Sequence, residues 1–270
     1  IMDEEGTWIG SAMRSEELEE VIAVSVTVDG TPLPDELPPD AVGERFEVTK
    51  HSKLGPLEHR ATTVIVGESI EQRHRFVAQR DVKLKTFYAF IYSLSPAADS
   101  WLAQDTSGQM QRGIFRQDGS HQPGMLCRWV AQHSSTTEEA TLCFLPTPVS
   151  GRGSRSQFWD RSAYHKLLIQ PNDGIIAAGT ELDYSMILHF LSASKAEWEE
   201  AVTRVAGEYM AKYPVSQAAK PPPAHERLYG EGVPEQGTLV CTTGNYTTTF
   251  AADRAWTIYT MGWRDVTFAL

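Results

Sequence analysis

Cysteine is scarce in this sequence, and its arrangement does not suit a disulfide framework. The three cysteines, Cys127, Cys143 and Cys241, form no CxxC pair, so neither a disulfide scaffold nor a thiolate zinc site is expected. A hairpin turning at Ser134 and Ser135 would place Cys127 opposite Cys143. The two would then form either a cross-strand bridge or two buried free thiols.

Long apolar runs and metal-binding motifs are also missing. No stretch approaches the roughly 18 apolar residues of a membrane span, and no basic-then-apolar leader opens the chain. The eight histidines include no HExxH motif and no HxH pair on a predicted strand. The glycine-bearing loop 151–156 lacks the GxxxxGK[ST] spacing of a phosphate loop. We therefore predict no membrane span, no metal site and no cofactor, and the sequence assigns no compartment.

Positive charge is in deficit. The formal net charge is −11, whereas binding to a phosphate backbone depends on clustered Lys and Arg that release counterions. Nucleic acid is therefore not an expected partner. Acidic residues are concentrated between Asp3 and Glu20, where a solvated surface is a simpler interpretation than an acidic docking patch.

Alternating β-branched and aromatic residues are abundant, above all in residues 46–95. Four alternating runs follow one another there with short turns such as Gly67-Glu68, the pattern of antiparallel strands. Further runs are predicted at 21–28, 126–131, 141–145, 158–169, 182–191 and 238–270. The sequence thus predicts an all-β, mainly antiparallel fold.

One helix is expected near the end of this series. Ser194 and Glu197 have the spacing of a capping box, and apolar residues recur at helical intervals from Trp198 to Tyr209 before Pro214. The proline-rich segment 216–237 has the composition of a linker. We expect a core over 1–215, this linker, and a β-meander over 238–270.

The order of these parts resembles the galactose-mutarotase-like supersandwich superfamily, which includes aldose epimerases and β-sandwich domains of polysaccharide lyases and glycoside hydrolases. The resemblance rests on the GTWIGS start, the VDG turn, the KHSKLG loop, the HRFVAQRDVKLKTFYAF hairpin, and YHKLLI followed by GTELDYSMILHF. It implies a supersandwich with one C-terminal packing helix. It also implies that residues 238–270 are displaced first strands that complete the same sandwich, by permutation, by strand exchange in a homo-oligomer, or because separate segments were joined.

Catalysis is less well supported by the resemblance. Epimerases of this superfamily use histidines and a carboxylate base, which lies shortly before a strand that matches 178–181 here. Between Ala140 and Glu181, however, the only acidic residues are Asp160 and Asp173. This departure puts epimerase activity in doubt, with Asp160 as the substitute base.

Three clusters could bind sugars, because aromatic rings cover the apolar face of a pyranose while cations donate to hydroxyls or to a uronate carboxylate. The simpler alternative for each residue is an ordinary half-buried or hydrogen-bonded place in a sheet. The first cluster contains His74, Arg80, Tyr88 and Tyr92. The second contains His51, Lys53 and Arg60, beside His59. In the third, Tyr164 and Lys166 share a strand face, whereas His165 points to the other.

We therefore expect a carbohydrate-binding domain, for a mono- or oligosaccharide or a uronate, within a saccharide-processing protein. One alternative is an epimerase-like or lyase-like enzyme, since a Tyr beside a cation can perform β-elimination. The other is a structural module whose sheet pairs with another subunit.

Overall fold

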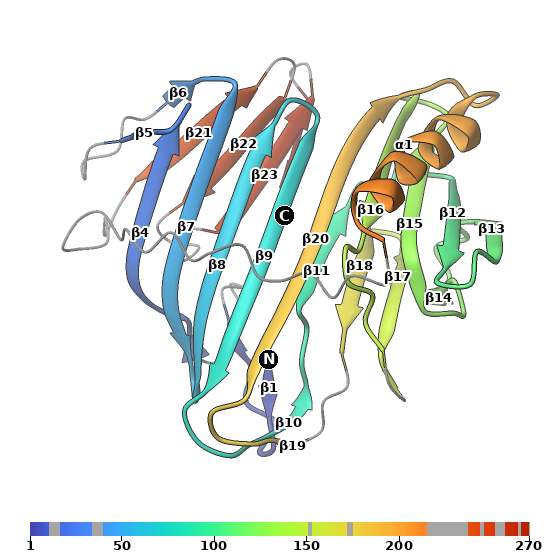
Figure 1. Ribbon diagram of the computed structural model, residues 1–270. Coiled ribbons are helices and arrows are strands. Elements are labelled where there is room, and N and C mark those ends of the chain that lie inside the picture. Colours follow the sequence, from blue (N-terminus) through green and yellow to red (C-terminus); the bar gives the residue numbers. More distant parts are fainter. Residues whose placement is uncertain are drawn as a thin grey trace. The chain divides into compact units, whose positions relative to one another are not determined.

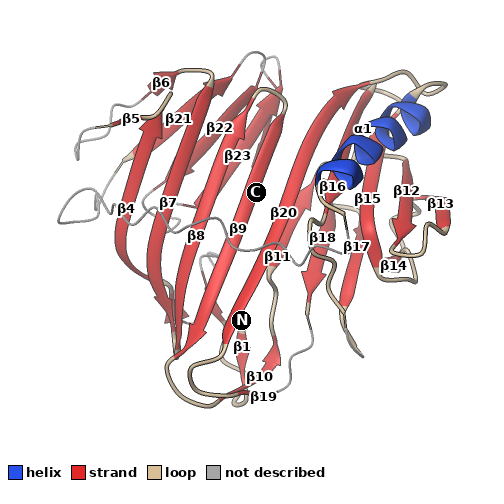
Figure 2. Ribbon diagram, in the orientation of Figure 1, coloured by secondary structure: helices blue, strands red, loops and turns tan. Residues whose placement is uncertain are grey.

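The computed structural model describes residues 1–10, 17–33, 40–150, 153–171, 175–214, 237–243, 246–251, 257–263 and 266–269. Strands dominate these residues, the strand pairs are mostly antiparallel, and one helix, α1 (Trp198–Lys212), follows β20 (Figures 1 and 2). The all-β prediction with one C-terminal helix is confirmed. Of the predicted linker 216–237, only Gly237 lies within the described residues.

The chain forms two compact units. The first contains residues 1–87, 173–184 and 225–270, and the second contains residues 88–172 and 185–224. The predicted extents, with a core over 1–215 and a completing meander, stay a prediction.

The first unit is built on long antiparallel hairpins. Their strands, in spatial order, are β9 (Ser69–Ala78), β8 (Leu57–Val66), β7 (Arg45–Leu54), β4 (Glu20–Val28) and β5 (Thr31–Pro32). Gly55 and Gly67 make the two tight turns with φ values of 55° and 52°, a left-handed backbone region that glycine enters without strain. Side chains alternate strictly along β7 and β8 between a buried and a more exposed face.

Short strands complete this unit. They are β1 (Met2–Asp3), β2 (Ile9–Gly10), β3 (Glu17–Leu18), β6 (Asp40–Val42), β10 (Val82–Thr86) and β19 (Ile175–Ile176). The predicted hairpin from β9 into β10 is wrong, because β10 pairs with β1 and β19, whereas β9 pairs with β8.

The C-terminal segment forms strands, as the sequence predicts. It consists of β21 (Thr238–Thr243), β22 (Tyr246–Ala251), β23 (Thr257–Trp263) and β24 (Val266–Ala269). Consecutive strands are antiparallel, and β21 pairs in parallel with β6. The Thr243 hydroxyl also donates to the carbonyl of Gly67 at 3.0 Å.

The second unit contains two groups of hydrogen-bonded strands. The first is β13 (Met110–Ile114), β12 (Ser100–Asp105), β15 (Cys127–Ser134), β16 (Glu139–Phe144) and the part of β20 (Glu181–Ser192) from Ser185 onward. The second is a four-stranded sheet in the order β11 (Phe90–Leu94), β18 (Tyr164–Gln170), β17 (Arg155–Arg161) and β14 (His121–Gln122).

The β15–β16 hairpin forms, but the predicted pairing of two cysteines across it is wrong. Cys143 lies opposite Val130. The turn consists of the four residues between Ser134 and Glu139 and not of Ser134 and Ser135, and this shifts the pairing of the two strands. Cys127, Cys143 and Cys241 are all free and buried. Burial raises the pKa of the Cys127 thiol to about 12, so this residue serves as a small apolar side chain.

Helix α1 packs its predicted stripe into a core with β15 and β16. Trp198, Val202 and Val205 are buried in that core, and Tyr209 packs against it. The predicted capping box does not form: the Ser194 hydroxyl donates to the side chain of Glu197 at 2.6 Å and does not cap the backbone. Within the described residues, no helix has the length and apolarity to span a membrane.

Trp198 should be a major contributor to the stability of the second unit. Its side chain is 4% exposed and its ring stacks on His133, with centroids 5.1 Å apart. We expect Trp198→Ala to lower the free energy of unfolding by about 3–5 kcal/mol, because it removes buried apolar surface and leaves a cavity. Urea denaturation would measure the loss, and Arg204→Ala on the exposed face of α1 should change it by less than about 0.5 kcal/mol. Equal effects of the two substitutions would contradict this role.

Candidate functional site

A buried network of charged and polar side chains lies in the first unit. The Glu19 carboxylate accepts hydrogen bonds from Lys50 Nζ at 2.7 Å, from His59 Nδ1 at 2.9 Å, and from the Ser52 hydroxyl. All four side chains are buried. Burial raises the pKa of Glu19, but Lys50 and His59 outweigh it, so the pKa lies well below its usual range and the carboxylate is ionised.

This network has the residue types of a Ser-His-Glu triad but not its geometry. Glu19 and Ser52 both approach Nδ1 of His59, the latter at 3.2 Å, whereas a triad places its nucleophile and its carboxylate on opposite ring nitrogens. The His59 ring also stacks on Phe76, with centroids 4.5 Å apart. Burial lowers the pKa of His59. The network is therefore a structural arrangement that compensates a buried lysine.

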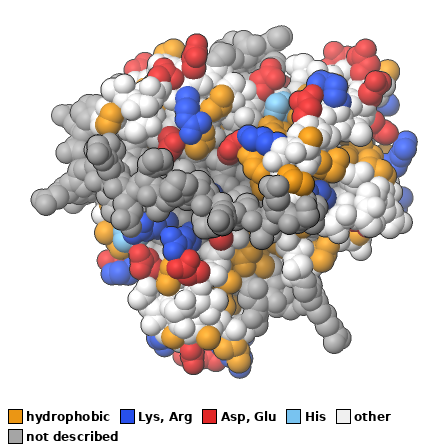
Figure 3. Space-filling view, in the orientation of Figure 1, with side chains coloured by type: hydrophobic (Ala, Val, Ile, Leu, Met, Phe, Trp, Pro, Cys, Tyr) orange, Lys and Arg blue, Asp and Glu red, His pale blue; other side chains and the backbone are white. Residues whose placement is uncertain are grey.

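The other face of the same sheet carries paired charges. His51 contacts Glu58 at 3.0 Å and Lys53 contacts Glu20 at 3.5 Å. Further along, Arg73 pairs with Asp183, and Arg75 with Glu181 at 2.7 Å. Figure 3 likewise shows basic and acidic side chains next to one another at several places on the visible face. Because these cations already have carboxylate partners, this face offers little net positive charge.

A different arrangement occupies the outward face of the four-stranded sheet. Trp159 and Arg161 lie two residues apart on β17, and Tyr164 and Lys166 lie two residues apart on β18. Trp159 pairs with Lys166 across the strands, and Arg161 pairs with Tyr164. We call these four residues the quartet; aromatic and cationic side chains alternate in it both along and across the strands.

The quartet is held by contacts between cations and rings. The Arg161 guanidinium lies 4.8 Å from the centroid of the Trp159 ring, and Lys166 Nζ lies 4.8 Å from that of Tyr164. Both distances are within the range of cation–π attraction, about 6 Å. Among the described residues, neither cation forms an ion pair with a carboxylate.

Two neighbours extend the quartet. His121 on β14 pairs with Trp159, and their rings are nearly parallel with centroids 5.8 Å apart. Arg155 lies at the start of β17 and is exposed. Burial lowers the pKa of His121 and Arg155 lowers it further, so the ring is largely neutral at pH 7. Arg155 lies on the same face of β17 as Trp159, because side chains alternate along the strand.

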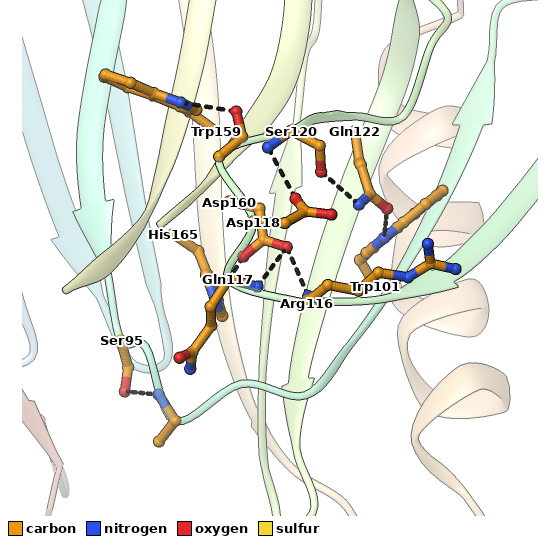
Figure 4. A network of polar contacts seen from close by, with 12 residues as sticks. Ser95, Trp101, Arg116, Gln117, Asp118, Ser120, Gln122, Trp159, Asp160 and His165 are labelled. Atoms are coloured by element: carbon orange, nitrogen blue, oxygen red, sulfur yellow. Dashed lines mark hydrogen bonds and ion pairs between the residues drawn. The ribbon is translucent and has the colours of Figure 1, made fainter. Parts of the chain in front are cut away.

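Asp160 lies directly beneath this surface and organises the adjoining loop (Figure 4). It is fully buried, and its Oδ2 accepts the backbone N–H groups of Arg116 at 2.6 Å and Gln117 at 3.0 Å. The same loop also contacts the quartet, because Trp159 Nε1 donates a hydrogen bond to the carbonyl of Gly119 at 3.1 Å. Asp160 therefore fixes the loop that fixes Trp159.

His165 completes the buried layer. Its Nε2 lies 3.4 Å from Asp160 Oδ1, and its ring stacks on Phe115 with centroids 3.7 Å apart. Burial lowers the pKa of His165, with Asp160 opposing this change. As predicted, His165 faces the opposite side of the strand from Tyr164 and Lys166.

The four residues of the first predicted cluster belong to two different units. His74 lies on β9 beside His59, with ring centroids 5.0 Å apart, and Arg80 is exposed in the turn that follows β9. Tyr88 and Tyr92 belong to the second unit; Tyr92 is buried, and it pairs with Leu167 on the inner face of the sheet. Burial raises the pKa of Tyr88, and Arg155 opposes this change.

The other two predicted clusters are each brought together. His51 pairs with Arg60 across β7 and β8, and Lys53 lies two residues from His51 on the same face. Tyr164 and Lys166 share the quartet. Sequence reasoning missed Trp159 and Arg161, although their spacing around the Ser162-Ala163 turn was a usable signal.

No protein-family model matches this sequence, and no curated protein sequence matches it. The chain is similar to the solved structure of GH36 alpha-galactosidase AgaA from Geobacillus stearothermophilus, with 11% sequence identity and a TM-score of 0.48, over 72% of this chain and 30% of that chain. It is similar to heparan sulfate lyase HepC from Pedobacter heparinus, with 8% identity and a TM-score of 0.30, over 91% and 30%. It is also similar to a Paenibacillus xanthan lyase, with 8% identity and a TM-score of 0.38, over 81% and 19%.

The chain therefore spans less than a third of the length of each of these three proteins. All three similarities are at 8–11% sequence identity and TM-scores of 0.30–0.48, so the resemblance to the supersandwich superfamily stays a prediction from the sequence.

Glu19 should be required for the stability of the first unit. We expect Glu19→Gln to lower the free energy of unfolding at pH 7 by about 3–5 kcal/mol, because it leaves Lys50 buried without its counter-charge. A Glu19→Gln, Lys50→Met double variant should recover part of this loss. Because the folded pKa of Glu19 is depressed, its contribution is present above the unfolded pKa of about 4.3 and is lost as pH falls toward the folded value. Urea denaturation at pH values from 7 to 3 should show that the free energy of unfolding falls more steeply in the wild type than in Glu19→Gln.

Asp160 should hold the 116–120 loop. We expect Asp160→Ala to accelerate hydrogen exchange at the amides of Arg116 and Gln117 and to destabilise the unit by about 1.5–3 kcal/mol, the range for hydrogen bonds to a charged group. Asp118→Ala is the matched control, because Asp118 is exposed and accepts a hydrogen bond only from Ser120 N among the contacts shown in Figure 4. If the loop amides exchange no faster in Asp160→Ala than in Asp118→Ala, the role assigned to Asp160 is wrong.

Proposed function

We propose that the outward face of the four-stranded sheet, centred on the quartet, binds carbohydrate. The observation that carries this is the alternation of Trp159, Arg161, Tyr164 and Lys166 on one outward face, with the cations on the rings. Protein sites for sugars need an aromatic platform for the apolar face of the ring and donors for its hydroxyls. The quartet supplies both within two adjacent strands.

The platform is also rigidly placed. Trp159 donates a hydrogen bond to the carbonyl of Gly119, and the 116–120 loop that contains Gly119 is held by Asp160. A side chain that is already ordered loses little conformational entropy when a ligand binds, so more of the contact energy remains as affinity. The polar side chain of Gln157, on the same face of β17, adds a hydrogen-bond donor and acceptor beside the platform.

The geometry supports binding over acid–base catalysis at this surface. Asp160, the predicted substitute for an epimerase base, is fully buried and its Oδ2 is occupied by two backbone N–H groups. A general base must reach the proton that it abstracts, and a buried carboxylate does not reach a ligand on the outer face. In the lyase alternative, Lys166 lies over the Tyr164 ring, an arrangement suited to holding a platform.

Replacing the platform should abolish most of the binding. We expect Trp159→Ala to weaken binding to a responsive oligosaccharide by about tenfold or more, because a central aromatic contact typically costs at least about 1–2 kcal/mol when truncated. Isothermal titration calorimetry would follow a glycan-array screen that selects the oligosaccharide. Tyr164→Ala should have a smaller effect in the same direction.

Trp8→Ala provides the control, because Trp8 is an exposed tryptophan of the first unit, 38% accessible. It should leave affinity unchanged. The function proposed for the quartet is wrong if no glycan binds the wild-type protein, or if Trp159→Ala binds as tightly as the wild type. A glycan that is converted to an unsaturated product, seen by its ultraviolet absorbance, would replace simple binding with the lyase alternative.

A further inference from the structure

We infer that the ligand of this face is an anionic oligosaccharide, carrying carboxylate or sulfate groups, rather than a neutral sugar. The inference rests on the proposed function of the quartet and specifies its substrate class. It is carried by the distribution of charge on the outward face of the four-stranded sheet and by the size of that face.

The charge on this face is of one sign. The side chains that β17 and β18 direct outward include three cations, Arg155, Arg161 and Lys166, and no carboxylate. The outward residues of the neighbouring strands, His121, Ile91 and Ser93, add no acid either. This local excess stands out in a chain with 35 acidic and 24 basic residues.

Two carboxylates adjoin this face, Asp160 and Asp118, and both accept hydrogen bonds. Asp160 is buried on the inner side and accepts backbone hydrogen bonds. Asp118, in the adjoining loop, accepts a hydrogen bond from Ser120 N at 2.9 Å, and hydrogen bonds from Ser120 lower the pKa of Asp118, with a smaller contribution from Arg116. Neither carboxylate forms an ion pair with Arg155, Arg161 or Lys166 in the part of the chain that the structure describes.

The contrast with the first unit shows that this is a property of the site. There, His51, Lys53 and Arg75 each contact a carboxylate on the same face or a neighbouring strand. On the quartet face the cations contact aromatic rings instead. A ring holds a cation in place without neutralising it, so its hydrogen-bond donors stay available for an anion.

The size of the face fits more than one sugar unit. His121, Trp159, Lys166 and Ser93 form a row across four neighbouring strands, which at about 4.8 Å per strand spans roughly 14 Å. From Arg155 to Arg161 along β17 is six residues, or about 20 Å at about 3.3 Å per residue. Cations separated in this way suit anionic groups on successive units of a chain.

The test uses one oligosaccharide in two charge states. Oligogalacturonate and its fully methyl-esterified form differ in charge but share the same backbone, and a sulfated oligosaccharide of similar length distinguishes sulfate from carboxylate as the anionic group. We expect the acid or the sulfated form to bind at least about tenfold more tightly than the ester, the equivalent of one charge-assisted contact. Its affinity should also fall as salt is raised from about 50 to 300 mM.

The cations are tested directly with matched variants. Arg161→Gln, Lys166→Gln should weaken binding of the preferred anionic form by about 100-fold, roughly tenfold for each contact, and binding of the ester by less than about threefold. Arg112→Gln, Arg204→Gln removes the same charge from other surfaces of the same unit and should leave both affinities unchanged. Circular dichroism would establish that both double variants are folded.

The possible outcomes distinguish a failure of the anionic preference from a failure of carbohydrate binding itself. If the acid, the sulfated form and the ester bind with equal affinity, and Trp159→Ala loses this binding, the inference is overturned. The proposal that the quartet binds carbohydrate would still stand. Binding of none of the three, nor of any arrayed glycan, would overturn both. Competition by inorganic sulfate at the same concentration as the oligosaccharide would show an anion site without saccharide recognition, and would also overturn the inference.

Discussion

The alternation of side chains along extended strands is the constraint on which the candidate site depends. On β17 and β18, each residue that faces outward is followed by one that faces inward, so Trp159 and Arg161 flank the buried Asp160, and Tyr164 and Lys166 flank the buried His165. The outer layer presents rings and cations, while the inner layer holds the loop that fixes Trp159. A register shift of one residue would exchange these layers, burying Arg161 and Lys166 and exposing Asp160 and His165.

The two buried charges of the candidate networks, Lys50 and Asp160, are each tied to a counter-charge or to the backbone. Lys50 is matched by Glu19 at 2.7 Å, and Asp160 by two backbone N–H groups and a histidine. An isolated buried charge would cost several kcal/mol, whereas a well-packed apolar pair could replace Glu19 and Lys50 together with little loss. Their value is therefore positional. The Asp160 contacts fix a loop at the edge of the quartet, and the Glu19 contacts join a residue just before β4 to β7 and β8.

The sequence predicts the local parts of this architecture and misses those that depend on distant partners. The β7–β8–β9 hairpins follow from alternation and from Gly55 and Gly67, and α1 follows from the stripe that begins at Trp198. By contrast, β10 pairs with β1 and β19, which lie about 80 to 90 residues away on either side in the sequence, and no local pattern encodes such a choice. Cys143 missed its predicted partner because turn length sets register. In the candidate site, the two-residue repeat of a strand predicts that Tyr164 and Lys166 share a face. The same repeat groups Tyr88 with Tyr92, but Tyr92 faces the core.

The partners of a cation, more than its presence, decide what a sheet face can do. Arg73, with a carboxylate opposite it on Asp183, has its guanidinium donors occupied and adds cohesion to its strands. Arg161 has the same guanidinium but lies over an indole ring, which attracts the charge, and among the described residues it pairs with no carboxylate. The energy of a new ion pair is small in water, because both partners must be desolvated and ordered. A cation that is already ordered and partly desolvated by a ring has met part of that cost in advance, so the quartet suits the proposed anionic ligand better than a paired cation of the first unit does.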